Sequence, residues 1–142
     1  MSDALKVQGQ CLCGETAFEV VLKDEHVDAC HCSMCRSWAA GPFMGVACET
    51  PSFTKDGALG VFSSSEWGER VFCKSCGSSL FWRTKDKAMT IVSAGAVPLS
   101  SRADFTLQVF VDEKPDYYAF ANATKTMTGA EVVAAFSASQ GE

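Results

Sequence analysis

The sequence has little positive charge, and the charge it has is scattered. Its 142 residues include 12 lysines and arginines against 17 acidic residues, so the net charge is −5 and the pI is about 5.0. No basic stripe is present that could release counterions from a phosphate backbone. The composition therefore argues against nucleic acid or an anionic membrane as the main partner.

Long apolar runs and targeting signals are also missing. No stretch approaches the roughly 18 apolar residues of a membrane-spanning helix. The N-terminal "MSDALKVQGQ" lacks a basic start followed by an apolar core. We therefore expect no signal peptide and a cytoplasmic protein. In a reducing compartment, clustered cysteines are metal ligands or catalytic groups more often than disulfides.

Repeats, low-complexity linkers and helix signals are scarce. At this length the chain is most simply one domain spanning residues 1–142. Only the tail has a good helix signal, because Thr128 can cap residues 129–139 with Glu131 at the third helical position. A one-turn helix over 34–39 is a weaker candidate.

Short strands make up most of the remaining pattern. Apolar, β-branched and aromatic residues gather in short segments that turn residues separate. These segments are 16–22, 41–48, 58–64, 69–73, 78–84, 88–94 and 107–112. The pattern predicts an all-β fold of mainly antiparallel sheets with a short C-terminal helix. We expect Phe43, Phe81 and Trp82 to lie in its core.

Cysteine is what the sequence does have, and seven of its eight cysteines lie in three clusters. Cys73 and Cys76 form a C-x-x-C-G knuckle, a spacing that lets two thiolates reach one tetrahedral ion. Cys11 and Cys13 can supply the other two ligands if the backbone bends at Gly14. We predict that these four cysteines hold a structural Zn²⁺ ion. Four buried thiols without a metal are the alternative.

The third group, Cys30, Cys32 and Cys35, has no obvious fourth protein ligand. Three thiolates with a vacant position are typical of a catalytic rather than a structural zinc site. Such a site carries a net charge of about −1, and it can bind and deprotonate an incoming thiol. We predict a second, catalytic Zn²⁺ ion here that holds a substrate thiol as its thiolate.

Other arrangements of this third group remain open from the residues alone. His31, His26 or Cys48 could close the coordination sphere and make the site structural. His31 lies between two ligands and is poorly placed to reach the same ion, and the polar turn around His26 favours a solvated side chain. Cys48 lies in an apolar strand and is most simply a small buried hydrophobic residue. An iron–sulfur cluster would also use cysteines, but the knuckle with a remote pair favours zinc. A redox dithiol is a further option, but no surrounding βαβ pattern supports it.

The segments "CLCG", "CHCSMCR", "FCKSCGSSLF" and "VFVDEKPDYY" occur in an order and spacing that resembles one known family. This is the glutathione-dependent formaldehyde-activating enzyme (GFA) family, which shares its domain with the centromere protein V group. The resemblance covers roughly residues 9–120 and implies a zinc-pinned β-tent of antiparallel sheets. By position, it assigns the structural zinc to Cys11, Cys13, Cys73 and Cys76, and the catalytic or thiol-binding site to Cys30, Cys32 and Cys35.

The reaction that this resemblance implies is the addition of glutathione to formaldehyde, which gives S-hydroxymethylglutathione. The sequence departs from the family's pattern in two places. Gln108 stands where many members carry a histidine, and Tyr117 or Tyr118 stands where a tryptophan often follows the "KP" pair. Neither departure removes a cysteine, so both bear on the substrate rather than on the fold or the metals.

Residues beside the third group have two interpretations each. Arg36 could bind a substrate carboxylate through a bidentate contact, or it could hydrogen-bond carbonyl groups and support the cysteine loop. His31 could shuttle a proton during thiol addition, although donation to the backbone or to a thiolate is the simpler expectation. Ser78 and Ser79 have no paired histidine and aspartate, so we expect no serine nucleophile.

The sequence thus supports two main classes of function. The first is a zinc-dependent carbon–sulfur lyase-like enzyme that adds glutathione or a similar thiol to formaldehyde or a related small aldehyde. The second is a non-catalytic, zinc-stabilised binding module in which both metal sites are structural, and a metal or thiol buffer is a third option. The coordination of the second ion distinguishes the first two, because an enzyme needs a vacant ligand position there. The sequence does not indicate an oligomeric state.

Overall fold

The computed structural model describes residues 5–140, which form two compact units. Within the described residues, the first unit comprises 5–26 and 45–103, and the second comprises 27–44 and 104–140. Two strands, β2 (Ala17–Cys30) and β3 (Phe43–Cys48), each run from one unit into the other. The single-domain organisation stays a prediction.

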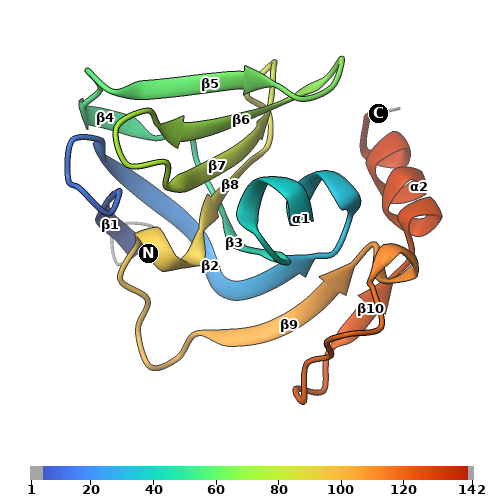
Figure 1. Ribbon diagram of the computed structural model, residues 1–142. Helices are drawn as coiled ribbons and strands as arrows, with labels where there is room; N and C mark the ends of the chain where they lie inside the picture. Colours follow the sequence, from blue (N-terminus) through green and yellow to red (C-terminus); the bar gives the residue numbers. More distant parts are fainter. Residues whose placement is uncertain (1–4, 141–142) are drawn as a thin grey trace. The chain divides into compact units, whose positions relative to one another are not determined.

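The first unit is built from short strands. Besides parts of β2 and β3, it contains β1 (Lys6–Gln10), β4 (Ser52–Lys55), β5 (Leu59–Ser63), β6 (Gly68–Cys73), β7 (Ser79–Thr84), β8 (Thr90–Ser93) and the 3₁₀ turn η2 (Ala94–Ala96). The strands β3, β8, β7, β6 and β5 pair antiparallel in that order, and β1 and β4 each pair with β2. Figure 1 shows β5, β6 and β7 side by side.

Period-two burial explains why these segments are strands. In β2, Phe18, Val20 and Leu22 alternate with more exposed residues and are almost completely buried. Phe18 packs edge-on against Phe81 of β7, with ring centroids 4.7 Å apart, and Phe53 of β4 contacts both rings. The core of the first unit therefore forms where β2, β4 and β7 meet. The prediction that Phe81 lies in the core is confirmed.

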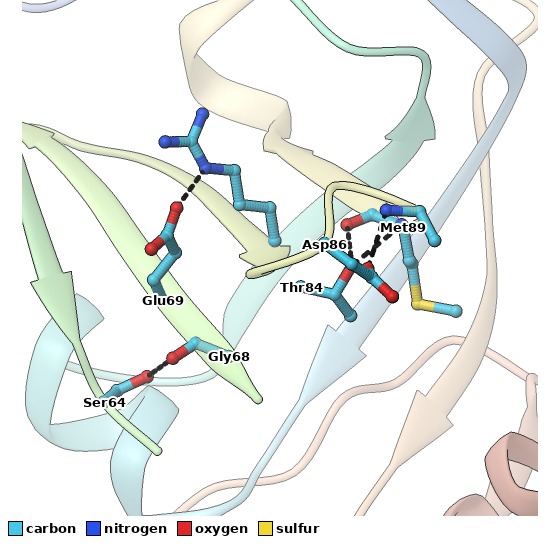
Figure 2. A network of polar contacts seen from close by, with 8 residues as sticks. Ser64, Gly68, Glu69, Thr84, Asp86 and Met89 are labelled. Atoms are coloured by element: carbon cyan, nitrogen blue, oxygen red, sulfur yellow. Dashed lines mark hydrogen bonds and ion pairs between the residues drawn. The ribbon is translucent and has the colours of Figure 1, made fainter. Parts of the chain in front are cut away.

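Polar contacts close the ends of the hairpins in this unit (Figure 2). The amide of Met89 donates to the Thr84 hydroxyl at 3.0 Å, and the Thr84 amide donates to the Met89 carbonyl at 3.0 Å. Glu69 and Arg83, which face each other across β6 and β7, form an ion pair at 2.7 Å. Ser64 donates to the Gly68 carbonyl at the β5–β6 turn. These contacts hold the strand ends in register.

The second unit contains the two α-helices. It comprises the end of β2, α1 (Ser33–Ala39), the start of β3, β9 (Asp104–Val109), the 3₁₀ turn η3 (Val111–Glu113), β10 (Lys125–Met127) and α2 (Gly129–Gln140). In the strand order β9 lies between β2 and β10, and β10 runs parallel to β9. Its aromatic contacts include Trp38 with Phe43, at 5.2 Å, and Phe105 with Phe120, at 4.9 Å.

Both predicted helices are confirmed. The amide of Glu131 donates to the Thr128 hydroxyl at 3.2 Å, and the Thr128 amide donates to the Glu131 carboxylate at 2.8 Å, which is the reciprocal capping box. The mainly antiparallel all-β class with a C-terminal helix is confirmed as well, with the parallel pair β9–β10 as an exception. None of the helices within residues 5–140 is long and apolar enough to cross a membrane.

Several strand boundaries differ from the prediction. The polar segment around His26 continues as part of β2 rather than forming a turn, and β1, β4 and β10 were not predicted. The strand expected at 107–112 is β9, which ends at Val109 because Phe110 adopts a left-handed conformation with φ of 56°. Trp82 is only half-buried and packs edge-on against Trp67, so its expected place in the core is wrong.

Candidate metal centres

The first centre is the four-sulfur cluster, which consists of Cys11, Cys13, Cys73 and Cys76. All four sulfur atoms lie within 4.8 Å of one another. The Cys11 and Cys13 sulfurs are 3.6 Å apart, and the Cys13 and Cys73 sulfurs are 3.8 Å apart. Thiolates bound to one tetrahedral zinc ion lie about 3.8 Å from each other, given zinc–sulfur bonds of about 2.3 Å. The spacing therefore fits a single tetrahedral ion.

Two glycine turns aim these sulfurs at a common point. Cys11 follows β1, and the amide of Gly14 donates to the Cys11 carbonyl at 3.2 Å. Cys73 ends β6, and the amide of Gly77 donates to the Cys73 carbonyl at 2.8 Å. Gly14 and Gly77 have φ angles of +82° and +81°, which strain any residue with a Cβ atom. The predicted bend at Gly14 is confirmed.

Ser78 supports this cluster, a role that the sequence did not suggest. Its hydroxyl oxygen accepts a hydrogen bond from the Leu12 amide at 3.0 Å and lies 3.2 Å from the Cys76 sulfur. The amide of Thr16 donates to the Cys11 sulfur at 3.4 Å. Ser78 thus connects the two cysteine pairs, and a serine directly after a C-x-x-C-G knuckle was the only available signal.

Cys13 and Cys76 have pKa values that are shifted in opposite directions. The Ser78 hydroxyl, followed by the Ser78 backbone amide, lowers the pKa of Cys76 to about 5. The Glu15 backbone amide lowers the pKa of Cys13, but desolvation and hydrogen bonds with the neighbouring thiols together raise that pKa to about 12. Four thiolates this close repel one another, so a divalent cation is needed for all of them to ionise near neutral pH. The donor set therefore fits a soft divalent metal such as zinc.

The second centre is the three-sulfur cluster, which consists of Cys30, Cys32 and Cys35. Cys30 ends β2, Cys32 is the N-cap of α1, and Cys35 lies in the first turn of that helix. Their sulfur atoms lie within 4.8 Å of one another. The amide of Cys35 donates to the Cys32 sulfur at 3.3 Å, so a thiol replaces the usual hydroxyl cap.

Within residues 5–140, no fourth cysteine, histidine, aspartate or glutamate joins the three-sulfur cluster. Cys32 and Cys35 are buried, and Cys30 is half-buried. Hydrogen bonds with the thiols of Cys32 and Cys35, together with burial, raise the pKa of Cys30 above its ordinary value. These thiols also need a cation in order to ionise together, so this donor set fits a metal ion with an unfilled coordination position.

His31 and Arg36 brace the cysteine loop. The side chain of His31 contacts the Tyr118 hydroxyl at 2.7 Å and the Gln108 side-chain carbonyl at 2.8 Å. The expectation that His31 donates to the backbone or to a thiolate is therefore wrong. Arg36 donates from Nε to the His31 carbonyl at 2.9 Å, which confirms its loop-supporting role. Binding of a substrate carboxylate by Arg36 stays a prediction.

Two other residues considered as ligands lie outside both clusters. Cys48 is buried in β3, its thiol donates to the Thr90 carbonyl at 3.6 Å, and burial raises its pKa to about 12. It is the small buried residue that the sequence predicted. His26 has an exposed side chain, as expected. None of the eight cysteines forms a disulfide.

Gln108, Glu113 and Tyr118 were not predicted as supports of the three-sulfur cluster. Glu113 accepts a hydrogen bond from the Ser33 amide at 2.8 Å, at the start of α1. In the sequence, Gln108 and Tyr118 stand out only as departures from the family's pattern. The segment "VFVDEKPDYY", which contains Glu113 and Tyr118, was the available signal, but nothing local connects it to the cysteines.

Comparison with known proteins gives three findings. The model of the family described as glutathione-dependent formaldehyde-activating enzyme matches residues 6–113, which include both clusters. An uncharacterized lyase of Schizosaccharomyces pombe is 35% identical over 128 residues, which cover 89% of this chain and 93% of the relative. A crystal structure of a Rhodobacter sphaeroides protein matches with a TM-score of 0.54 at 19% identity, covering 63% of this chain and 85% of the other.

The structural match supports the fold alone, because its sequence identity is low. The family model and the yeast relative carry the assignment, since each spans most of this chain. The chain therefore belongs to the glutathione-dependent formaldehyde-activating enzyme family.

Proposed function

We propose that the protein is a zinc-dependent carbon–sulfur lyase-like enzyme that joins glutathione or a similar thiol to formaldehyde or a related small aldehyde. The observation that carries this proposal is the three-sulfur cluster, which has no fourth protein ligand within residues 5–140. Family membership and the name of the yeast relative support the same class of reaction. Reduced cysteines are essential to this chemistry, which agrees with the cytoplasmic location predicted from the sequence.

In this proposal, Cys30, Cys32 and Cys35 hold the ion from one side. A bound Zn²⁺ ion supplies a Lewis acid that lowers the pKa of a coordinating thiol. The helix cap at Cys32 and the Arg36 bond to the His31 carbonyl keep the cysteine loop in place while the thiol enters. Three cysteine ligands would leave one position of a four-coordinate ion unfilled, and the substrate sulfur would take that position.

The reaction balances without an electron acceptor. The thiol sulfur forms one bond to the carbonyl carbon, and the π bond of the carbonyl breaks. The thiol proton ends on the former carbonyl oxygen, and with glutathione and formaldehyde the product is S-hydroxymethylglutathione. In the reverse direction the carbon–sulfur bond breaks, which is the lyase reaction.

The four-sulfur cluster has a different role in this proposal. Four sulfurs complete a tetrahedron and leave no position for a substrate. A metal ion there would tie the turn after β1 to the turn after β6, in sequence segments about 60 residues apart. We assign it to stabilising the first unit.

The test is Cys32→Ser. Serine is a preferred N-cap, so the variant keeps a cap for α1 while losing one metal ligand. We expect the fold to persist, the zinc content to fall from about two ions towards about one per chain, and glutathione binding to be lost. Calorimetry measures binding, and exchange-rate NMR compares thiol–formaldehyde exchange with the spontaneous reaction.

Cys48→Ala is the matched control, because it removes a thiol outside both clusters. It should keep both metals and the parent exchange rate. If Cys32→Ser binds glutathione as the parent does, the thiol-site proposal fails. If the parent protein contains two zinc ions but neither binds glutathione nor accelerates exchange, the non-catalytic binding module becomes the better description.

A further inference from the structure

His31 is a fully buried residue with partners for all four of its polar groups. Its backbone amide donates to the Val109 carbonyl at 3.1 Å, and its carbonyl accepts from Arg36 Nε at 2.9 Å. Its ring nitrogens contact the Tyr118 hydroxyl at 2.7 Å and the Gln108 side-chain carbonyl at 2.8 Å. Three separate parts of the second unit therefore hold one residue: β9, α1 and the segment that contains Tyr118.

The direction of these hydrogen bonds follows from Gln108. Its side-chain nitrogen donates to the Thr124 hydroxyl at 3.0 Å, so its side-chain oxygen faces His31. That oxygen can only accept, which places a hydrogen on Nε2 of His31. In the neutral imidazole, Nδ1 then accepts from the Tyr118 hydroxyl. Each group has a partner of the right kind, so the ring is held in one orientation.

The position of His31 gives this arrangement a consequence for the cysteines. Cys30 and Cys32 are its neighbours in sequence, and both belong to the three-sulfur cluster. A residue held through its ring, its amide and its carbonyl has little freedom in its backbone dihedral angles. Its two neighbours are therefore also restricted in where they place their sulfur atoms.

We infer that His31, held by Gln108 and Tyr118, is a positioning residue that keeps the Cys30 and Cys32 sulfurs in a metal-binding arrangement before an ion enters. This inference rests on the proposed function only in taking the three-sulfur cluster as a metal site. Partners beyond the ligands commonly change metal affinity by roughly 10–100-fold, because they orient the ligating groups. In this protein, His31 orients the ligands by restricting the backbone next to Cys30 and Cys32, rather than by a hydrogen bond to a ligand's side chain.

The experiment uses Tyr118→Phe in the full chain, with Co²⁺ alone as the probe. This variant removes the hydroxyl that contacts His31 and keeps the ring that packs against Phe120. Cobalt bound to thiolates has charge-transfer and d–d absorption bands that report ligand number and geometry. The four-sulfur cluster, which lies in the other unit, serves as an internal reference in every titration.

We expect Tyr118→Phe to bind Co²⁺ about tenfold more weakly at the three-sulfur cluster, with altered d–d bands and unchanged binding at the four-sulfur cluster. Tyr117→Phe is the matched control, because Tyr117 is 81% exposed, and it should behave as the parent does. Gln108→Leu should weaken the same site. The double variant should lose less than the sum of the two effects, since both act through one ring.

Parent affinity and an unchanged spectrum in both Tyr118→Phe and Gln108→Leu would overturn the inference. An equal loss in Tyr117→Phe would do so too, and so would loss of amide hydrogen-exchange protection throughout β9 and α2, which would indicate general unfolding of the unit. The proposed function is tested separately. If the variants show the expected changes in Co²⁺ binding but the parent protein binds no thiol, the inference about His31 stands and the proposed enzyme function fails.

Discussion

The two cysteine clusters are organised in opposite ways. In the four-sulfur cluster the ligands come from sequence segments about 60 residues apart, while the supporting groups, Gly14, Gly77 and Ser78, lie next to the ligands in sequence. In the three-sulfur cluster the ligands come from one short loop. Arg36 supports this segment locally, but its other supporting side chains, Gln108, Glu113 and Tyr118, lie 77, 80 and 87 residues away from their partners.

This difference indicates that the two clusters have different roles: the four-sulfur cluster is suited to stabilising the fold, and the three-sulfur cluster is suited to a reactive site. Ligands from distant segments close a long loop, so a metal ion bound to them stabilises the fold that brings them together. Ligands a few residues apart close only a very short loop when they bind an ion, so an ion there adds little to the stability of the fold. Such a site can lose or exchange its ion, but its geometry then depends on tertiary contacts.

The largest effect should come from Cys76→Ser, which makes at the four-sulfur cluster the same chemical change that Cys32→Ser makes at the other. Structural zinc contributes on the order of 10 kcal/mol to the folding of small zinc-binding peptides. We expect Cys76→Ser to lose its metal and to aggregate or unfold, while Cys32→Ser stays folded. Circular dichroism and metal analysis of both variants measure this contrast. A soluble, folded Cys76→Ser protein would remove the distinction between the clusters.

An intermediate effect should come from Ser78→Ala. The Ser78 hydroxyl is the main cause of the lowered pKa of Cys76, so its removal raises that pKa towards the ordinary value. Protons compete with the metal for the sulfur, and a higher pKa lets them displace it at a higher pH. We expect the midpoint of acid-induced zinc release from the four-sulfur cluster to move upward by a fraction of a pH unit.

A zinc-sensitive dye, read during a pH titration, follows this release. Ser75→Ala is the control, because the Ser75 hydroxyl donates to the Glu15 carboxylate at 3.0 Å rather than to a cysteine sulfur. Its zinc should leave at the parent pH. An unchanged or lower midpoint in Ser78→Ala would mean that Ser78 does not tune this cluster.

The smallest effect should come from Glu113→Ala at the three-sulfur cluster. Its carboxylate accepts from the Ser33 amide at the start of α1, and the bond is exposed to solvent. Loss of such a cap costs about 0.5–1 kcal/mol. We expect urea unfolding to show a change of this size, with a slight loss of Co²⁺ affinity at this cluster. Glu113→Gln keeps an acceptor oxygen, so it should retain most of the stability and most of the Co²⁺ affinity. A larger loss in Glu113→Gln than in Glu113→Ala would argue against this capping role.

The parts that the sequence predicted well are those with a local physical cause. The capping box at Thr128 and Glu131, the knuckle at Cys73 and Cys76 and the bend at Gly14 each depend on residues a few positions apart. Strand boundaries were less accurate. The polar segment around His26 reads as a turn, yet it lies inside the 14-residue strand β2, and the pairing of a long strand with other strands is not visible in a local pattern.

By itself, the sequence determined which neighbouring cysteines could share an ion, because C-x-x-C, C-x-C-G and the "CHCSMC" segment set how far apart neighbouring sulfurs can lie. Only the tertiary structure decided that the two remote cysteine pairs meet, and what surrounds each cluster. The contacts of His31 with Gln108 and Tyr118 depend on how β9 aligns with the end of β2. That register is a property of the folded sheet, because hydrogen bonds between such distant residues form only after the backbone has brought them together.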